Sequence, residues 1–441
     1  MVDGARPTAS DEPDRLGTIA GDLRAAARRY GTPLYLTDAA TLATAADEVR
    51  AAFPDPWIRQ YSVKANDVAA LVARVATHGF GANVVSLGEW SIARRAGLPN
   101  QAITLEGIGK TDADLRAAVA AAATGDPLRW VTVESADEAA TLSDMTRRAG
   151  SVRLDVLLRF NPAVEPETQH GLAVGAGSSK FGLADDELGA AIEAGGGPDG
   201  ALRWRGLHLH VGSQLGAVDA WRDAVRRALA LVGLLGGGLA EFDTLDVGGG
   251  FPVGALGDPS PGPKRFAREL PALLEGVPSA RRPRRLAIEP GRFLVARAGW
   301  LVARVLHVRE RGGGPMVVLD AGMTELIRPA LYDAHHAIVA LSSLGQPLDS
   351  SAVATAMTVT KAAATSLTAV HGPICESSDE LGNHALPPLR RGDLVAFRDA
   401  GAYAASFSST YNGRPLPPQV MREVDGRLVL VRRRGGVARL G

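Results

Sequence analysis

The sequence predicts an α/β fold in which a (β/α)8 barrel of the TIM type is combined with a second, mostly β domain. Short apolar runs rich in β-branched residues alternate with Ala-, Arg- and Leu-rich stretches of helical spacing, a pattern typical of parallel strands joined by helices. Eight such runs lie between Ile58 and Glu289, and a barrel of eight strands typically needs roughly 250 residues. After about Val302 the helical periodicity fades. A doubly wound sheet is the alternative for the first part.

The barrel elements follow one another in regular order. The eight strands are expected at Ile58–Val63, Asn83–Ser86, Ala102–Glu106, Trp130–Ser135, Arg153–Phe160, Gly206–Val211, Phe242–Val247 and Arg285–Glu289. Helices are expected between them at Ala69–His78, Leu87–Ala96, Thr111–Ala123 and Asp219–Leu235.

The second domain is expected to be discontinuous in the sequence. Gly, Pro and Ser clusters separate short strands at Val317–Asp320, Asp393–Arg398 and Arg427–Arg433, and the strand-like Pro33–Thr37 precedes the barrel. We therefore expect the barrel over 38–302 and the β domain over 31–37 and 303–441. The acidic, proline-containing residues 1–30 are expected to be a disordered tail.

Composition restricts the classes of partner. The 441 residues carry 48 Lys and Arg against 48 Asp and Glu, so the chain lacks the charge typical of proteins that bind nucleic acids or membrane surfaces. A small-molecule partner is favoured instead. The single cysteine, Cys375, excludes an internal disulfide and indicates a reducing compartment, with the cytoplasm as the expected location. We expect neither a secretion signal nor a transmembrane segment.

Polar residues stand where the predicted strands end, which is the catalytic face of a barrel. Lys64, Glu134, Arg159, His210 and Glu289 occupy five of these positions, and the seventh strand ends in a glycine triplet at 248–250. Each feature has a plain structural alternative: a salt-bridged lysine, a core histidine, a tight turn, or an acid that pairs with an arginine. An unpaired buried ammonium would be costly and would have a depressed pKa, which makes Lys64 a plausible Schiff-base residue.

Taken together, these features match the anchors of pyridoxal 5′-phosphate. The cofactor needs an amine to bind covalently, backbone amides for its phosphate, a flat surface against its ring and a carboxylate at its pyridine nitrogen. No metal site is expected, because the His and acidic residues lack ligand spacing.

Segments along most of the chain resemble the fold-type III pyridoxal-phosphate decarboxylases, and the diaminopimelate-decarboxylating branch most closely. YSVKAN, GLHLHVGSQ, LDVGGGF and IEPGRF lie in the barrel, and RPALYDA, GPICES and DAGAY follow in the second domain. The resemblance implies an alanine-racemase-like barrel with a C-terminal β-sandwich or β-barrel. It also implies decarboxylation of meso-diaminopimelate to L-lysine.

The resemblance assigns roles to individual residues. It implies that Lys64 binds the cofactor, His210 stacks on its ring and Glu289 pairs with the ring nitrogen. The remaining cofactor-binding residues it implies are Ser213, Gly248, Gly249, Gly250, Gly291, Arg292 and Tyr403. The substrate-binding residues it implies are Arg292, Arg328 and Tyr332 for a distal carboxylate, Glu376 for a distal ammonium, and Tyr403.

Cys375 is either a small buried apolar residue or a functional group. In the family the matching residue reaches into the neighbouring subunit's site and is placed to protonate the carbanion, so the resemblance implies a homodimer with shared sites. His208 has no such support, and we interpret it as structural.

Departures from the family pattern leave the substrate open. Where the family usually has Asp-Val-Val-Ser-Gly-Gly-Glu, this chain has Asn83 and Leu87. Phe293 replaces a small residue that usually follows Glu-Pro-Gly-Arg. Asn83 and Phe293 could therefore reshape the rim of the substrate pocket. The alternatives are a paralogous decarboxylase of another carboxyl-bearing amino acid, an amino-acid racemase, and a non-enzymatic pyridoxal-phosphate carrier. The residues beyond the barrel argue against the carrier.

Overall fold

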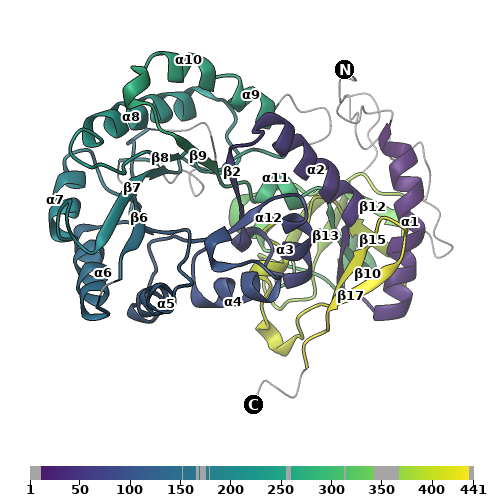
Figure 1. The fold of residues 1–441 in the computed structure, drawn as a ribbon. Helices are drawn as coiled ribbons and strands as arrows, with labels where there is room; N and C mark the ends of the chain where they lie inside the picture. The colour runs from purple at the N-terminus through teal and green to yellow at the C-terminus, as the bar shows by residue number, and fades with distance from the viewer. Residues whose placement is uncertain are drawn as a thin grey trace. The chain divides into compact units, whose positions relative to one another are not determined.

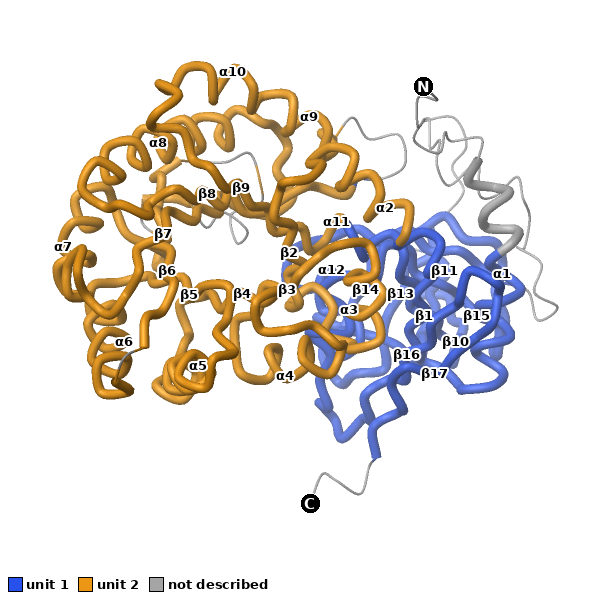
Figure 2. Tube along the Cα trace, in the orientation of Figure 1, with its two compact units in different colours: residues 1–42, 254–259, 294–441 blue, residues 43–253, 260–293 orange. Residues whose placement is uncertain are grey.

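The computed structural model describes residues 11–150, 152–164, 168, 175–177, 179–254, 260–311, 314–341 and 367–436, with side chains from residue 19 onward. The chain divides into two compact units (Figure 2). Unit 1 contains residues 1–42, 254–259 and 294–441, and unit 2 contains residues 43–253 and 260–293. The units change at 42/43 and 293/294, five and nine residues from the boundaries expected at 37/38 and 302/303.

Unit 2 is a closed barrel of eight strands that pair in sequence order, with the last strand pairing with the first. Figure 1 shows the ring of strands with helices on its outside. The strands are β2 (Ile58–Ser62), β3 (Gly81–Val84), β4 (Ile103–Leu105), β5 (Trp130–Val133), β6 (Leu154–Phe160), β7 (Leu202–Leu209), β8 (Thr244–Asp246) and β9 (Arg285–Ile288). All neighbouring pairs are parallel, which confirms the predicted (β/α)8 barrel.

The helices of the barrel alternate with its strands along the chain, with two short helices after β8. They are α2 (Ala39–Ala52), which starts in unit 1, α3 (Ala69–Ala76), α4 (Leu87–Arg95), α5 (Asp112–Ala123), α6 (Ala136–Arg148), α7 (Glu187–Ala194), α8 (Asp219–Leu235), α9 (Pro263–Ala267) and α10 (Leu270–Glu275). Short 3-10 helices lie at η1 (Val63–Ala65), η2 (Asn100–Ala102) and η4 (Ser279–Arg281). Ser86 and Ser135 cap α4 and α6 by accepting the backbone N–H of Glu89 and Glu138. These caps fix the loops that carry the polar strand ends.

Unit 1 is mostly β structure. Its strands are β1 (Leu34–Asp38), β10 (Gly299–Arg311), β11 (Gly314–Leu319), β12 (Ile338–Leu341), β13 (Thr368–His371), β14 (Glu380–His384), β15 (Leu394–Phe397), β16 (Gln419–Arg422) and β17 (Leu428–Arg432). Short helices lie at α11 (Arg292–Val295), which starts in unit 2, α12 (Arg328–Tyr332), η5 (Ala405–Phe407) and η6 (Tyr411–Gly413). β1 pairs with β10 and β16, so a strand that precedes the barrel in sequence is part of the β domain, as predicted.

The prediction of a disordered tail over residues 1–30 is wrong for residues 11–30. Helix α1 covers Asp11–Tyr30, and its residues Ile19, Leu23 and Ala27 are buried. They belong to a core cluster that includes Leu36 and Trp300. The spacing of four residues places these side chains on one face of the helix, which packs on the sheet of unit 1. Among the described helices, none combines the length and the apolar character needed to cross a membrane.

Candidate active site

Every strand of the barrel contributes a polar side chain in or directly after its last residues. These residues are Lys64 after β2, Asn83 in β3, Glu106 after β4, Glu134 after β5, Arg159 in β6, His208 in β7 with His210 just beyond, Asp246 in β8 and Glu289 after β9. The carboxyl ends of parallel strands share one face of a barrel, so these groups gather there.

Lys64 lies in η1, the short helix that continues from β2. Its neighbours Val63 and Ala65 are buried, whereas Lys64 itself is exposed. The expectation of a buried ammonium is therefore wrong. The backbone of Lys64 is anchored by its buried neighbours while its amine remains accessible to a small molecule.

The glycine triplet forms a tight backbone turn against His210. The Gly249 N–H donates to His210 Nδ1 at 3.2 Å, so a neutral His210 carries its proton on Nε2. A Cβ on Gly249 would lie 2.2 Å from the Glu289 carbonyl oxygen, and Gly248 has a φ of +69°. Only glycine fits these positions. Burial, followed by the nearby charge of Lys64, lowers the pKa of His210 well below its usual value, which favours the neutral ring.

Ser213 and Arg292 meet beside this turn. Arg292 Nε and Nη2 both donate to Ser213 Oγ at 3.4 Å, and the Arg292 side chain is buried. Gly291 precedes Arg292, and a Cβ there would lie 3.0 Å from Ser62 Cβ in β2. A hydroxyl, a guanidinium and a glycine turn are thus grouped in unit 2 in a manner suited to a phosphate.

Glu289 is buried among polar side chains from three other strands. Asn83 Nδ2 donates to Glu289 Oε1 and, at 2.9 Å, to Glu106 Oε2. His208 Nε2 lies 3.2 Å from Glu289 Oε2 and 3.3 Å from Glu106 Oε2. Asn83 is therefore inside the barrel and not at a pocket rim, and His208 contacts the predicted cofactor acid.

Sequence spacing did not reveal this cluster, which we call the Glu289 network: Asn83, Glu106, His208 and Glu289. Its members are far apart in the chain and come from four strands. Ligand atoms of Glu106, His208 and Glu289 lie within 4.8 Å of one another, which is close enough for a metal site. Inward-facing polar residues near strand ends were the signal that could have found it.

A separate ion pair joins the ends of the neighbouring strands β5 and β6. Arg159 Nη1 lies 2.7 Å from Glu134 Oε1, and both side chains are buried. Glu134 Oε2 also accepts the backbone N–H of Gly182, and the Arg159 guanidinium lies 4.7 Å from the centre of the Phe181 ring. These contacts explain why two charged side chains, Glu134 and Arg159, can be buried without a bound ligand.

Arg328 and Tyr332, both predicted to bind substrate, lie in α12 of unit 1. Arg328 is buried, and its Nη1 is 2.9 Å from His336 Nε2. His336 Nδ1 in turn lies 2.9 Å from the Arg398 carbonyl oxygen, so the neutral ring donates there and accepts from Arg328. These contacts fix the direction of the guanidinium, whereas Tyr332 is only partly buried.

Cys375 and Glu376 are both exposed in a loop of unit 1. The buried Asp379 carboxylate accepts the backbone N–H of Ile374 at 2.7 Å. Asn412 Oδ1 accepts the Cys375 N–H, and the Tyr411 hydroxyl donates to Glu376. Because Cys375 is exposed, the alternative that it is a small buried apolar residue is wrong. Tyr403, also in unit 1, is partly buried with a φ of +56°.

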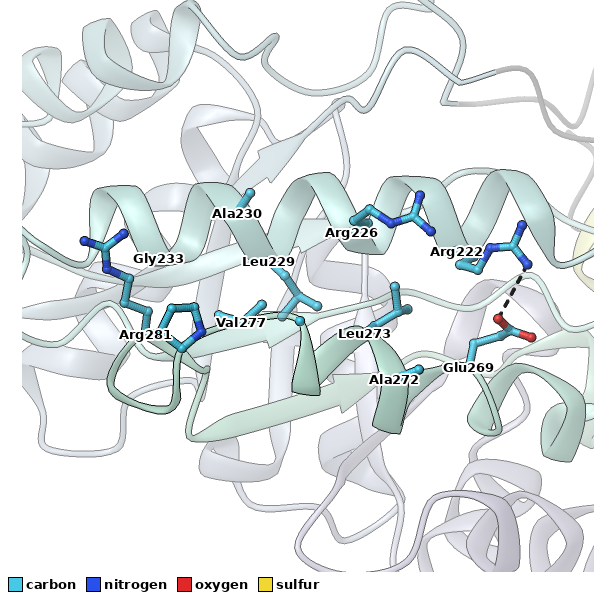
Figure 3. Close-up of a pocket in the computed structure, with 12 residues that line it drawn as sticks. Arg222, Arg226, Leu229, Ala230, Gly233, Glu269, Ala272, Leu273, Val277 and Arg281 are labelled. Carbon is cyan, nitrogen blue, oxygen red and sulfur yellow. Dashed lines mark ion pairs between the residues drawn. The ribbon is translucent and has the colours of Figure 1, made fainter.

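A groove of about 480 Å³ lies on the outer side of the barrel, between α8 and the segment around α10 (Figure 3). Arg222, Arg226 and Arg281 line it, and Arg222 pairs with Glu269 at 3.5 Å. No predicted site residue lines this groove.

Comparison with known proteins identifies the family. The family model "Pyridoxal-dependent decarboxylase, pyridoxal binding domain" matches residues 39–296. The diaminopimelate decarboxylase of Aquifex aeolicus is 33% identical over 93% of this chain and 91% of its own length. That of Deinococcus radiodurans is 36% identical over 90% and 92%. This chain belongs to the pyridoxal-dependent decarboxylases. Within them it groups with the diaminopimelate decarboxylases.

Solved structures of diaminopimelate decarboxylases share the fold. The diaminopimelate decarboxylase from "m. jannaschii", in complex with L-lysine, has a TM-score of 0.82 and 28% identity, and the match covers 94% of this chain and 92% of that one. Family membership makes pyridoxal 5′-phosphate the cofactor. The residues of unit 2 fit it: an accessible lysine, a turn that only glycine can make, a Ser213–Arg292 pair and a buried carboxylate.

Proposed function

We propose that this chain decarboxylates meso-diaminopimelate at one of its two amino-acid centres and releases L-lysine and carbon dioxide. The observation that carries the proposal is the gathering of Lys64, His210, the glycine turn, the Ser213–Arg292 pair and Glu289 at one face of the barrel. The substrate follows from the relatives, which are named diaminopimelate decarboxylases and match almost the full chain.

The residues of unit 2 would hold the cofactor. Lys64 would bind it covalently through its amine, and neutral His210 would lie against its ring. Ser213, Gly248, Gly249, Gly250, Gly291 and Arg292 would hold the phosphate. When bound, the cofactor supplies an electron sink for the pair of electrons that the departing carboxylate leaves behind. Glu289 would place its negative charge at the ring nitrogen, which keeps that nitrogen protonated.

The residues of unit 1 would recognise the substrate and supply a proton. Arg328 and Tyr332, together with Arg292 of unit 2, would bind the distal carboxylate, because a guanidinium can bond a planar anion at two points. Glu376 would take the distal ammonium, and Tyr403 would contact cofactor and substrate. Cys375 would donate the proton that replaces the lost carboxylate.

The test is carbon dioxide release from a panel containing meso-diaminopimelate, L-lysine, ornithine and arginine. We expect kcat/KM for meso-diaminopimelate to exceed that for lysine and ornithine by a large factor, because those substrates lack a distal carboxylate and would leave the binding guanidinium groups without their anion. A ratio near one, or no release from meso-diaminopimelate, would point to a paralogous decarboxylase with another substrate.

We also propose that the active form is a homodimer with shared sites, in the cytoplasm. The exposed position of Cys375 and Glu376 supports the dimer, because a loop that serves a neighbouring subunit must be accessible. Inactive Lys64→Ala and Cys375→Ala chains should regain activity when they are mixed and allowed to exchange subunits, since one of the two hybrid sites then has both residues. No recovery after verified exchange would place both residues in the site of one chain.

A further inference from the structure

The Glu289 network contains three titratable groups, although only one of them, Glu289, is assigned to the ring nitrogen of the cofactor. Glu106, His208 and Glu289 are all buried, and the same His208 Nε2 is within 3.3 Å of a carboxylate oxygen from each acid. Asn83 donates to both acids from the other side. Two carboxylates in such contact cannot both be ionised unless a positive charge lies between them.

The surroundings of His208 do not favour a positive imidazole. His208 Nδ1 is buried and has no hydrogen-bond partner within the described residues, so a charged ring would leave a buried N–H unpaired. One proton must then reside on the two acids. Glu106 Oε1 is also buried without a partner within the same residues, which disfavours its ionised form.

We propose that Asn83, Glu106 and His208 are positioning residues that keep Glu289 anionic, with the proton of the network held on Glu106. The proposal rests on the proposed role of Glu289 at the cofactor's ring nitrogen. His208 then remains neutral and donates through Nε2, while the Asn83 amide fixes both carboxyl groups. The network as a whole carries one negative charge, which matches one protonated ring nitrogen.

Charges on the neighbouring strands are consistent with this distribution. Burial, and then the charge of Glu289, raises the pKa of Glu106 to about 8, whereas burial lowers the pKa of His208 to about 4. The other groups that act on these two are Arg159, Glu134 and Lys64. Asp246 in β8 accepts the Gly248 N–H, and burial raises its pKa well above the usual value.

The pH dependence follows from these directions. The folded chain holds the Glu106 proton more tightly than the unfolded chain, whose Glu pKa is near 4.5. The contribution of Glu106 to stability is therefore complete below that pH and is lost as the pH rises through about 8. His208 has the opposite sign, with stability gained as the pH rises from about 4 to 6.5. Above pH 6.5 only Glu106 should titrate within this pair.

The experiment compares the holoenzyme with its Glu106→Gln variant, with Glu275→Gln as the control at an exposed site in α10. The infrared difference spectrum at pH 7 should show the loss of one protonated-carboxyl band in Glu106→Gln and no loss in Glu275→Gln. That band should titrate near pH 8 in the wild type. The cofactor absorbance of the wild type should change over the same range, and that of Glu106→Gln should not. A spectrum with no lost band would overturn the proposal.

Asn83→Leu gives a second and independent measurement. It removes the amide that donates to both carboxyl groups and adds no charge, so kcat should fall about tenfold or more while KM for the substrate stays within about twofold. An unchanged kcat would contradict the positioning role. Stoichiometric zinc in the purified holoenzyme, lost in Glu106→Gln, would also overturn the proposal because a cation would then hold the two carboxylates. A wild type that binds the cofactor but leaves meso-diaminopimelate intact would refute the substrate, while the infrared result would still stand.

Discussion

The two units hold their predicted functional residues in different ways. In the barrel, Glu289 and its partners are buried side chains on strands, and each is held by side-chain hydrogen bonds from other strands. In the β domain, Cys375 and Glu376 are exposed on a loop that is held mainly through its backbone, by Asp379 and Asn412. The barrel residues are thus suited to fixing charge and protonation, and the loop residues to meeting a substrate or a neighbouring subunit.

The largest effect is expected from a change among the barrel residues. Lys64→Ala removes the amine that binds the cofactor covalently, so it should abolish both turnover and the visible absorbance of the lysine-bound cofactor. The fold should remain, because Lys64 is exposed and its buried neighbours are unchanged. Circular dichroism provides the control for folding. A borohydride-reducible lysine adduct in this variant would show that another lysine holds the cofactor.

A smaller effect is expected from the recognition of the distal carboxylate. Arg328→Gln should raise KM for meso-diaminopimelate and narrow its advantage over lysine, with a loss of about 2–5 kcal/mol in transition-state binding if the ion pair is buried. The cofactor absorbance should be unchanged. Steady-state kinetics with both substrates measure this ratio, and an equal loss for both substrates would argue against a carboxylate-binding role.

The barrel could be predicted from sequence because buried parallel strands are continuous apolar runs. Ile103–Leu105 and Trp130–Val133, for example, are buried at every position. The helix over 11–30 was missed because its acidic, proline-containing start hid the spacing of Ile19, Leu23 and Ala27, whose burial depends on a sheet formed by distant strands.

The glycine turn and Lys64 could be located from their positions after strands, whereas the contacts within the Glu289 network could not. Asn83, Glu106 and His208 are brought together only by closure of the barrel, so no local pattern reports their contact. The roles assigned to Arg328, Cys375, Glu376 and Tyr403 came from the family resemblance and remain predictions.

The most direct test of the different roles of the barrel residues and the loop residues is the absorbance of the bound cofactor in two variants, measured beside turnover. Glu289→Gln should retain the cofactor, alter its pH-dependent spectrum and reduce kcat by roughly 10²-fold or more, because a neutral amide cannot stabilise the protonated ring nitrogen. Cys375→Ala should reduce turnover while leaving that spectrum as in the wild type. A normal spectrum in Glu289→Gln would contradict the claim that Glu289 in the barrel keeps the ring nitrogen protonated. An altered spectrum in Cys375→Ala would contradict the claim that the loop acts on the substrate and not on the cofactor.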